Sequence, residues 1–377
     1  MKDYPVIDAD GHIYETTIID WENAIAEPYK RIAPKVITLP NGGKRLLLEG
    51  QQWPRHFPSE DKPGATEYSG LHRSREGMWN PKLRLEHLDV DGIDTAVLFG
   101  GALMVGASSL RNAGLGAEVA RVYNDWVHTF CQANPKRLKG VACVAYQNPE
   151  AGGKELDRAV KELGFVGVGI PTNINGLGLD DAFFAPLFED AQSLDIPMCI
   201  GHGMGVAHGI HSVGQERISS RFVIMATNFP LELMLTIAIC VSRGLFDKYP
   251  KLKFAFLEGW VSWLPFWVER MEEYVESYAS HTEMKARPSE YIKGPQFYAG
   301  CEPSEEALPE VVEAIGEDHI LYASDYWHFD AKFPGSVKTI LEKKGLSETA
   351  KRKLLYDNAS RLYKLSVNGG KAAKATK

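Results

Sequence analysis

The sequence lacks the features that mark several classes of protein. Its five cysteines are scattered through 377 residues without a Cys-x-x-Cys pair, which excludes a disulfide scaffold and favours a reduced, cytoplasmic setting. A formal net charge of −7 excludes the basic footprint of a nucleic-acid-binding protein. The N-terminal stretch "MKDYPVIDAD" has no apolar core of a signal peptide. The longest apolar helical stretch, residues 231–241, contains Glu232 and is too short to cross a membrane. We therefore expect a cytoplasmic protein that binds neither nucleic acid nor membrane.

Short apolar runs recur along the chain, and helical patterns separate them. The runs are continuous rather than alternating, as expected of strands that are covered on both faces. They lie at residues 5–12, 94–101, 138–148, 165–172, 197–203, 253–259, 296–302 and 320–325. A doubly wound sheet would be expected to carry a glycine-rich phosphate loop early in the chain, and none is present. The α/β alternation therefore predicts a (β/α)8 TIM barrel.

Two helices can be outlined from the sequence. Residues 263–278 place their apolar side chains on one helical stripe. In the stretch 303–319, Ser304 is expected to cap the start of a helix, and Gly316 is expected to end it.

The stretch between the first two strands interrupts this alternation. "VITLPNGGKRLLLEGQQW" predicts a β-hairpin that turns at Asn41-Gly42-Gly43. The polar residues 56–77 predict a long loop, and loops of this length commonly form lids. We expect residues 1–365 to form a single barrel domain, with residues 36–80 inserted as hairpin and lid and residues 366–377 as a disordered tail.

Six polar side chains fall where the predicted strands end. They are Asp10, His12, His202, Glu258, Asp325 and His328. The carboxyl ends of barrel strands meet at one end of the barrel, which is where active sites of this fold lie. Asp10 and His12 are two residues apart on one strand, so both point to the same face. The sequence therefore predicts that these side chains converge on one site.

Several motifs resemble the amidohydrolase superfamily, in its branch of decarboxylases and carbon–carbon or amide hydrolases. They are "DADGH", "IGHG", "FLEGWVSWLPFWVERM", "ILYASDYWHFD" and "DNASRLYKL", which together span residues 8–365. The resemblance implies a metal-dependent barrel enzyme. It also implies that Asp10, His12, His202 and Asp325 hold a divalent metal ion.

The residue types agree with this implication. Imidazoles and carboxylates are good ligands for Zn²⁺, Mn²⁺ or Fe²⁺. Related hydrolases often carry a second histidine where Asp10 stands, and the added negative charge shifts the expected preference from zinc towards manganese or iron. We expect one metal ion, with two as the alternative.

Glu258 departs from the related pattern, because some members carry a histidine at the end of this strand. Three roles remain open for it: a catalytic base, a ligand of a second metal, or a structural ion pair with Arg270 or Arg221. His328 is expected to orient a ligand, donate to the substrate or bind a second metal. Asp8 is expected to pack or to form hydrogen bonds beneath the site. Asp325, Glu258 and His328 are thus the candidate catalytic residues.

A small carboxylate, with an aromatic ring as one option, suits the remaining candidates. Trp260 and Trp327 are expected to form an apolar wall, and Arg217 or Arg221 to meet the carboxylate of the substrate. His208 and His211 lie on the loop after the fifth strand and are further candidates for substrate binding.

Three functions fit these features. The first is a metal-dependent hydrolase or decarboxylase. The second is an oxygen-activating dinuclear iron or iron–manganese oxygenase, which would use Glu258 and His328 as ligands of the second ion. The third is a metal-binding partner subunit of a related enzyme. The chain is expected to form a homodimer or a hetero-oligomer with a related barrel.

Overall fold

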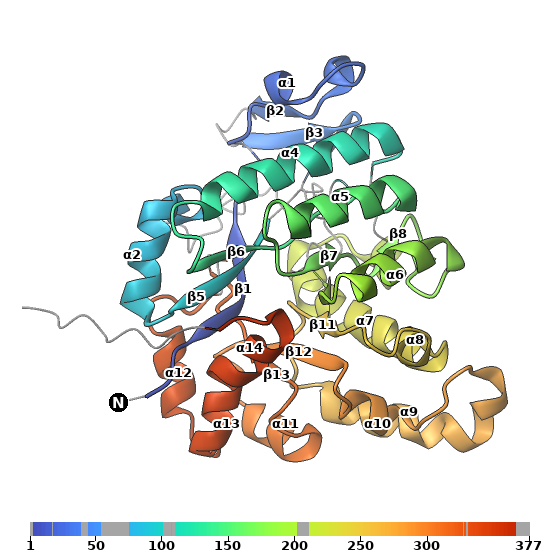
Figure 1. The fold of residues 1–377 in the computed structure, drawn as a ribbon. Helices are drawn as coiled ribbons and strands as arrows, with labels where there is room; N and C mark the ends of the chain where they lie inside the picture. Colours follow the sequence, from blue (N-terminus) through green and yellow to red (C-terminus); the bar gives the residue numbers. More distant parts are fainter. Residues whose placement is uncertain are drawn as a thin grey trace, which may run out of the picture.

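Parallel strands lie at the centre of the molecule and helices cover them on the outside (Figure 1). The computed structural model describes residues 3–16, 18–38, 44–53, 75–100, 107, 110–201, 211–326, 328 and 331–366. The parallel strands are β1 (Ile7–Ile13), β5 (Thr95–Gly100), β6 (Leu138–Gly140), β7 (Val168–Ile170), β10 (Met198–Ile200), β11 (Phe254–Phe256), β12 (Phe297–Cys301) and β13 (Ile320–Tyr322). Each overlaps one of the eight predicted runs. With few exceptions their residues are fully buried, which explains why the runs do not alternate.

The parallel strands pair into two sheets. Regular pairing gives the orders β1-β5-β6 and β13-β12-β11-β10-β7. Among the described residues, the links between the sheets include a bridge between Ala142 and Val168 and a hydrogen bond of 3.2 Å from the amide of Asp325 to the carbonyl of Asp10. With these links the strands follow the order of a barrel, but the described ladders do not close into one continuous sheet. The α/β core is confirmed, and the closed barrel remains a proposal.

The helices between these strands pack against them and bury one large apolar core. They are α2 (Pro81–Asp91), α4 (Ala113–Cys131), α5 (Pro149–Lys161), α6 (Ala185–Ser193), α7 (Arg221–Ser242), α8 (Leu245–Lys248), α9 (Leu264–Tyr278), α10 (Pro288–Ile292), α11 (Leu308–Ile315), α12 (Ser336–Glu342), α13 (Glu348–Arg352) and α14 (Asn358–Tyr363). Helix α9 coincides with the predicted stripe at 263–278. The described cysteines are all buried.

The start of α11 corrects the predicted cap at Ser304. The helix begins at Leu308 after Ala307, with Pro309 in its first turn, and it ends at Gly316 as predicted. Proline suits the first turn of a helix because its missing N–H is not needed there. The preceding segment is instead held by Glu305, whose carboxylate accepts hydrogen bonds from the amides of Val261 and Ser262 at 2.8 Å.

Helix α7 corrects the prediction that residues 231–241 form the longest apolar helical stretch. The helix runs from Arg221 to Ser242 and continues through Pro230, which reads in the sequence as a break. Residues Phe222–Ser242 are long and apolar enough to cross a membrane, with a mean hydropathy of 1.8, although core helices of soluble proteins meet the same criterion. The predicted extent of this apolar helix was therefore wrong.

A small antiparallel sheet lies between β1 and β5 in the chain. It contains β2 (Lys35–Thr38), β3 (Lys44–Leu48) and β4 (Gln51–Trp53), and β2 pairs with β3 from Lys35↔Leu47 to Thr38↔Lys44. Figure 1 shows it beside α4, together with α1 (Trp21–Ala24). The predicted turn at Asn41 and most of the predicted lid at 56–77 lie outside the described residues. A two-stranded pair, β8 (Asn173–Ile174) with β9 (Leu177–Gly178), follows β7.

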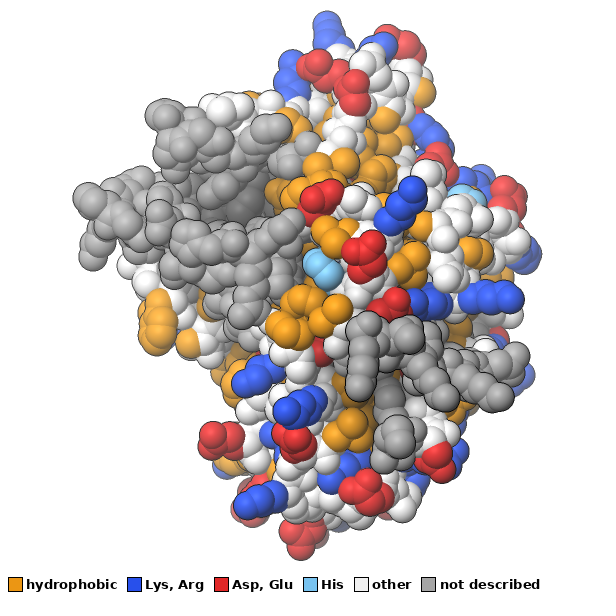
Figure 2. All heavy atoms as spheres, turned by 90° about the vertical axis from the view of Figure 1, so that its left-hand side faces the viewer, with side chains coloured by type: hydrophobic (Ala, Val, Ile, Leu, Met, Phe, Trp, Pro, Cys, Tyr) orange, Lys and Arg blue, Asp and Glu red, His pale blue; other side chains and the backbone are white. Residues whose placement is uncertain are grey.

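Charged side chains of both signs are interspersed over one face of the molecule. Figure 2 shows red and blue side chains mixed with white ones, and hydrophobic side chains gathered around a histidine near the centre. This mixture is ordinary for a protein surface.

Candidate metal centre

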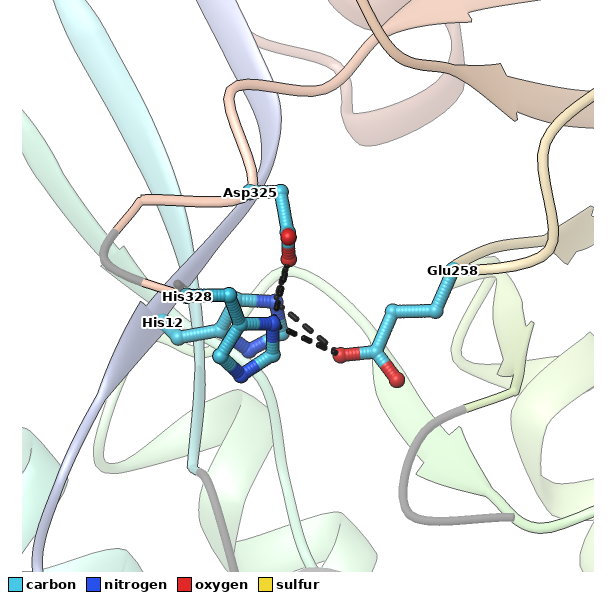
Figure 3. Close-up of side chains that lie close together, drawn as sticks. All are labelled: His12, Glu258, Asp325 and His328. Carbon is cyan, nitrogen blue, oxygen red and sulfur yellow. Dashed lines mark ion pairs between the residues drawn. The ribbon is translucent and has the colours of Figure 1, made fainter. Parts of the chain in front are cut away.

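Four side chains from the ends of three strands meet at one point (Figure 3). His12 lies on β1, Glu258 follows β11, and Asp325 and His328 follow β13. One ligand atom from each of the four lies within 4.8 Å of the other three. The structure thus brings together four of the six side chains that the sequence predicted to converge.

The distances within this cluster are short. Nε2 of His12 lies 3.1 Å from Oε1 of Glu258 and 2.9 Å from Oδ1 of Asp325. Nδ1 of His328 lies 2.6 Å from the same Asp325 oxygen, and the two imidazole rings stack with centroids 4.1 Å apart. Among the described residues, this buried oxygen has no partner with hydrogen-bond geometry. One nitrogen or oxygen atom of each side chain is therefore close enough to the others to bind a single ion together with them.

Asp10 lies at the edge of the cluster. Its Oδ1 is 3.8 Å from Nε2 of His12, and its side chain is buried. Burial raises the pKa of Asp10 well above its ordinary value, and the negative charges of Asp325 and Asp8 raise it further. Three carboxylates in a buried space need a compensating positive charge, and a divalent cation would supply it.

Asp325 behaves differently from Asp10. Burial alone would raise the pKa of Asp325, but the adjacent imidazoles of His328 and His12 lower it below its ordinary value. Asp325 is therefore held as a carboxylate, the form that binds metal.

The donor set fits a divalent metal ion. Two imidazoles and carboxylate oxygens are ligands of zinc, manganese and iron alike, and a larger share of oxygen favours manganese over zinc. Of the four ligands that the sequence predicts, Asp10, His12 and Asp325 are among the described residues, with Asp10 at the edge of the cluster. The fourth predicted ligand, His202, lies outside the described residues.

The two carboxylates that face the histidines have a left-handed backbone. Glu258 has φ +60° and Asp325 has φ +50°, a region that costs a residue other than glycine about 1–3 kcal/mol. The surrounding backbone fixes both. The amide of Leu257, before Glu258, donates to the backbone carbonyl of Ile200 at 2.9 Å. The amide of His328 donates to the backbone carbonyl of Asp325 at 2.9 Å. Such residues commonly occur at functional sites, because the surrounding structure must hold them.

Asp8 forms hydrogen bonds beneath the cluster, as the sequence suggested. Its carboxylate accepts from the amide and hydroxyl of Ser324 at 2.8 Å and 2.6 Å, and from the amide of Asp10 at 3.3 Å. Asp8 thus ties β1 to the residue that precedes Asp325. An irregularity in the pairing of β1 with β5 between Asp8 and Gly11 gives β1 one extra residue there.

Arg84, on α2, was not singled out from the sequence. It is fully buried, and its Nη1 donates to the carbonyl of His12 at 2.8 Å. Its guanidinium lies 3.9 Å from the ring centroid of Tyr326, whose carbonyl accepts from the amide of His12 at 2.6 Å. Arg84 therefore contacts the backbone of the candidate ligand His12 and the ring of Tyr326, the residue that follows the candidate ligand Asp325. A side chain at Gly11 would meet Nη2 of Arg84 at 2.5 Å, so this position needs glycine.

A sequence signal for Arg84 does exist. The buried residues of α2 are Arg84, Leu88 and Asp91, which share one helical face. A charged residue on a buried face needs a specific partner. In the same helix, Nδ1 of His87 contacts the hydroxyl of Tyr326. Both α2 side chains therefore hold Tyr326, next to Asp325.

We predict that Arg84→Met weakens metal binding roughly 10-fold to 100-fold, the range seen when groups behind metal ligands are removed. The variant loses the donor to His12 and the positive charge near Asp8. Manganese titration of the dialysed protein measures the effect.

Arg84→Lys should restore only part of the affinity, because an ammonium cannot reproduce the planar contact of the guanidinium. Arg352→Met is the matched control, since Arg352 lies over the ring of Tyr4, outside the cluster. Unchanged affinity in Arg84→Met would show that Arg84 serves the fold alone.

The other predicted residues lie in several places. His211 is exposed, and Arg217 is exposed and paired with Glu216 at 3.1 Å. Trp260 lies two residues after Glu258 and is 45% exposed. Arg270 stacks on Tyr274 at 4.6 Å. His208 and Trp327 fall outside the described residues, as does the side chain of Arg221. Their roles in substrate binding remain predictions.

Comparison with known proteins identifies the family to which this chain is similar. The amidohydrolase family model matches residues 7–365. A 2-amino-3-carboxymuconate-6-semialdehyde decarboxylase of Dictyostelium discoideum is 30% identical over 296 residues, 77% of this chain and 78% of the relative. A gamma-resorcylate decarboxylase of a Polaromonas species is 27% identical over 75% of this chain and 87% of the relative.

A solved structure extends the similarity to the fold. The 5-carboxyvanillate decarboxylase of Novosphingobium aromaticivorans, with bound manganese and 3-methoxy-4-hydroxy-5-nitrobenzoic acid, superposes with a TM-score of 0.71 at 21% identity. The match covers 96% of this chain and 98% of that one. Together with the family model, these matches show that the chain belongs to the amidohydrolase family.

Proposed function

We propose that this protein is a metal-dependent decarboxylase of a small aromatic carboxylate. The convergence of His12, Glu258, Asp325 and His328 at the strand ends carries the proposal. The names of the relatives support decarboxylation over the hydrolase and oxygenase hypotheses. In this proposal the parallel strands close into a (β/α)8 barrel, and the insertion at 36–80 covers its carboxyl end.

One divalent ion, held by Asp10, His12, Asp325 and the predicted ligand His202, completes the site. When bound, it supplies a positive charge that holds the substrate's carboxylate and neighbouring oxygen atoms. Manganese is the metal that we favour, because two of these ligands are carboxylates and a structural relative contains manganese. The lowered pKa of Asp325 keeps it an ionised ligand rather than a proton donor.

Glu258 and His328 handle the proton that replaces the departing carboxylate. A C–H bond forms at the ring carbon, the C–C bond to the carboxylate breaks, and carbon dioxide leaves. The side chain of Glu258 is 8% exposed and lies 3.1 Å from His12, so it can deliver a proton inside the site. The side chain of His328 is 37% exposed and lies 3.9 Å from Glu258, so it can return a proton from solvent.

The exposed ring of Trp260, next to Gly259 and Glu258, gives the substrate ring an apolar wall in this proposal. The predicted Trp327 would add to that wall. A cation such as Arg217 or Arg221 would meet a second anionic group of the substrate.

The test is release of carbon dioxide from hydroxylated benzoates. Protein loaded with manganese should decarboxylate at least one member of a panel that includes 2,6-dihydroxybenzoate and 5-carboxyvanillate. In D₂O the product should carry one deuterium at the carbon that lost the carboxylate. Hydrolysis of an amide or lactone without carbon dioxide release, or oxygen consumption during turnover, would contradict the proposal.

A further inference from the structure

The turn after β11 has an unusual backbone conformation. Glu258 has φ +60° and Trp260 has φ +59°, with Gly259 between them. Positive φ is rare for a bulky residue such as tryptophan, because its Cβ then crowds the neighbouring carbonyl oxygen. The side chain of Trp260 is 45% exposed, so its ring is not locked into the core. Contacts from outside the turn must therefore stabilise this conformation.

Glu305, between β12 and α11, makes such contacts. Its side chain is fully buried. Its Oε2 accepts three hydrogen bonds: from the amide of Val261 at 2.8 Å, from the amide of Ser262 at 2.8 Å and from the hydroxyl of Ser262 at 2.7 Å. Its Oε1 accepts from the amide of Glu302 at 2.9 Å. Both carboxylate oxygens of Glu305 are thus bound to backbone amides, two of which belong to the turn after β11.

Three further contacts fix the same turn. Nε1 of Trp263 donates to the carbonyl of Gly259 at 2.6 Å. A Cβ atom at Gly259 would lie 2.3 Å from Cδ1 of Leu233, so the turn packs tightly against α7. Nζ of Lys343 donates to the carbonyl of Glu305 at 2.7 Å and so anchors the backbone of Glu305 itself. The turn is therefore held by α7 on one side and by the segment after β12 on the other.

We propose that Glu305 is a positioning residue for the reaction, because its carboxylate holds the turn that directs Glu258 at the metal centre. Figure 3 shows the side chain of Glu258 reaching towards His12 and His328. Oε1 of Glu258 lies 3.1 Å from Nε2 of His12. A turn that relaxed from positive φ would carry this oxygen away from the centre. The inference rests on the proposed function, in which Glu258 delivers the proton.

Glu305→Gln tests this role. Both carboxylate oxygens accept from backbone amides, so the NH₂ group of glutamine meets an N–H group whichever way it is turned. In the manganese-loaded protein we expect kcat for decarboxylation to fall roughly 10-fold to 100-fold, the loss that a displaced catalytic group can cause. Metal per chain should stay unchanged, because Glu305 is not part of the cluster.

Asp91→Asn is the matched control. Asp91 is also buried, and its carboxylate accepts from the amide of Ser336 at 3.0 Å, outside the cluster. Both variants should lower the melting temperature, since each leaves a buried amide poorly paired. Only Glu305→Gln should lower kcat.

A double-mutant cycle separates positioning from a general effect on the fold. If Glu305 acts through Glu258, Glu305→Gln should change the residual rate of Glu258→Gln by less than about 3-fold. An equal loss of rate in both backgrounds, or no loss in the parent background, would overturn the proposal.

Hydrogen exchange tests the turn without turnover. We expect the amides of residues 258–263 to exchange roughly 10-fold faster or more in Glu305→Gln, while those of residues 322–326 keep the parental rate. Unchanged exchange in the turn would also overturn the proposal. A parent that decarboxylates no benzoate would contradict the proposed function instead, and the exchange rates would still decide whether Glu305 holds the turn.

Discussion

Asp325→Asn should leave the protein folded with almost no bound metal. Oδ1 of Asp325 lies 2.9 Å from His12 and 2.6 Å from His328, so it stands between two further donors. The amide keeps the size of the side chain but removes its negative charge. We expect the affinity for manganese to fall about 100-fold or more. Mutation of residues that only hydrogen-bond to metal ligands already lowers metal affinity roughly 10-fold to 100-fold. Elemental analysis after dialysis, with circular dichroism as the test of folding, measures both quantities.

Asp318→Asn is the matched control for this change. Asp318 lies just before β13, at the opposite end of the strand, and pairs with Lys353 at 2.9 Å on the surface. It should keep its metal. Full metal occupancy in Asp325→Asn would remove Asp325 from the ligand set and with it the centre as we describe it.

Glu258→Gln should abolish decarboxylation while metal content stays at one ion per chain. The amide has nearly the same shape as the carboxyl group but cannot deliver a proton to the ring carbon. We expect the rate of carbon dioxide release to fall roughly 100-fold to 10,000-fold, the usual contribution of a positioned acid or base. Metal per chain must be measured in the parent and in the variant, in protein purified without added metal.

The same measurement separates the leading hypotheses. If the parent holds two ions including iron, and Glu258→Gln holds one, Glu258 is a ligand of a second metal, and the dinuclear oxygenase becomes the better account. Glu302→Gln is the control, because Glu302 also follows a central strand, β12, but lies outside the cluster. It should change neither metal content nor rate.

The strands could be predicted because burial on both faces leaves a direct trace in the sequence. Each central strand is a run of apolar residues, and the polar residue that ends the run marks the functional edge of the sheet. This is why His12, Glu258, Asp325 and His328 could be named together. Spacing alone could not give the irregularity in β1 or the left-handed backbone at Glu258, because both depend on packing against neighbouring strands.

The errors arose where tertiary contacts override local preference. Pro230 suggests a helix end, yet α7 passes through it, because the buried side of the helix is anchored in the core along its length. Ser304 looks like a cap, but Glu305 beside it is turned inward to hold Val261, and the helix starts later. Arg84 was missed because its partners, His12 and Tyr326, are 72 and 242 residues away in the chain.

Selection for thermal stability alone is expected to replace Glu258 and Asp325, because both residues have a strained, left-handed backbone conformation. Glycine adopts positive φ without strain, and asparagine tolerates it better than most residues. A search for stabilised variants is therefore expected to favour these two substitutions at the positions that hold the carboxylates. Each such gain would come with loss of the reactive centre. Engineering of this protein should keep Glu258 and Asp325 unchanged. A related sequence with glycine at either position is a candidate for a protein that retains the fold but has lost the catalytic activity.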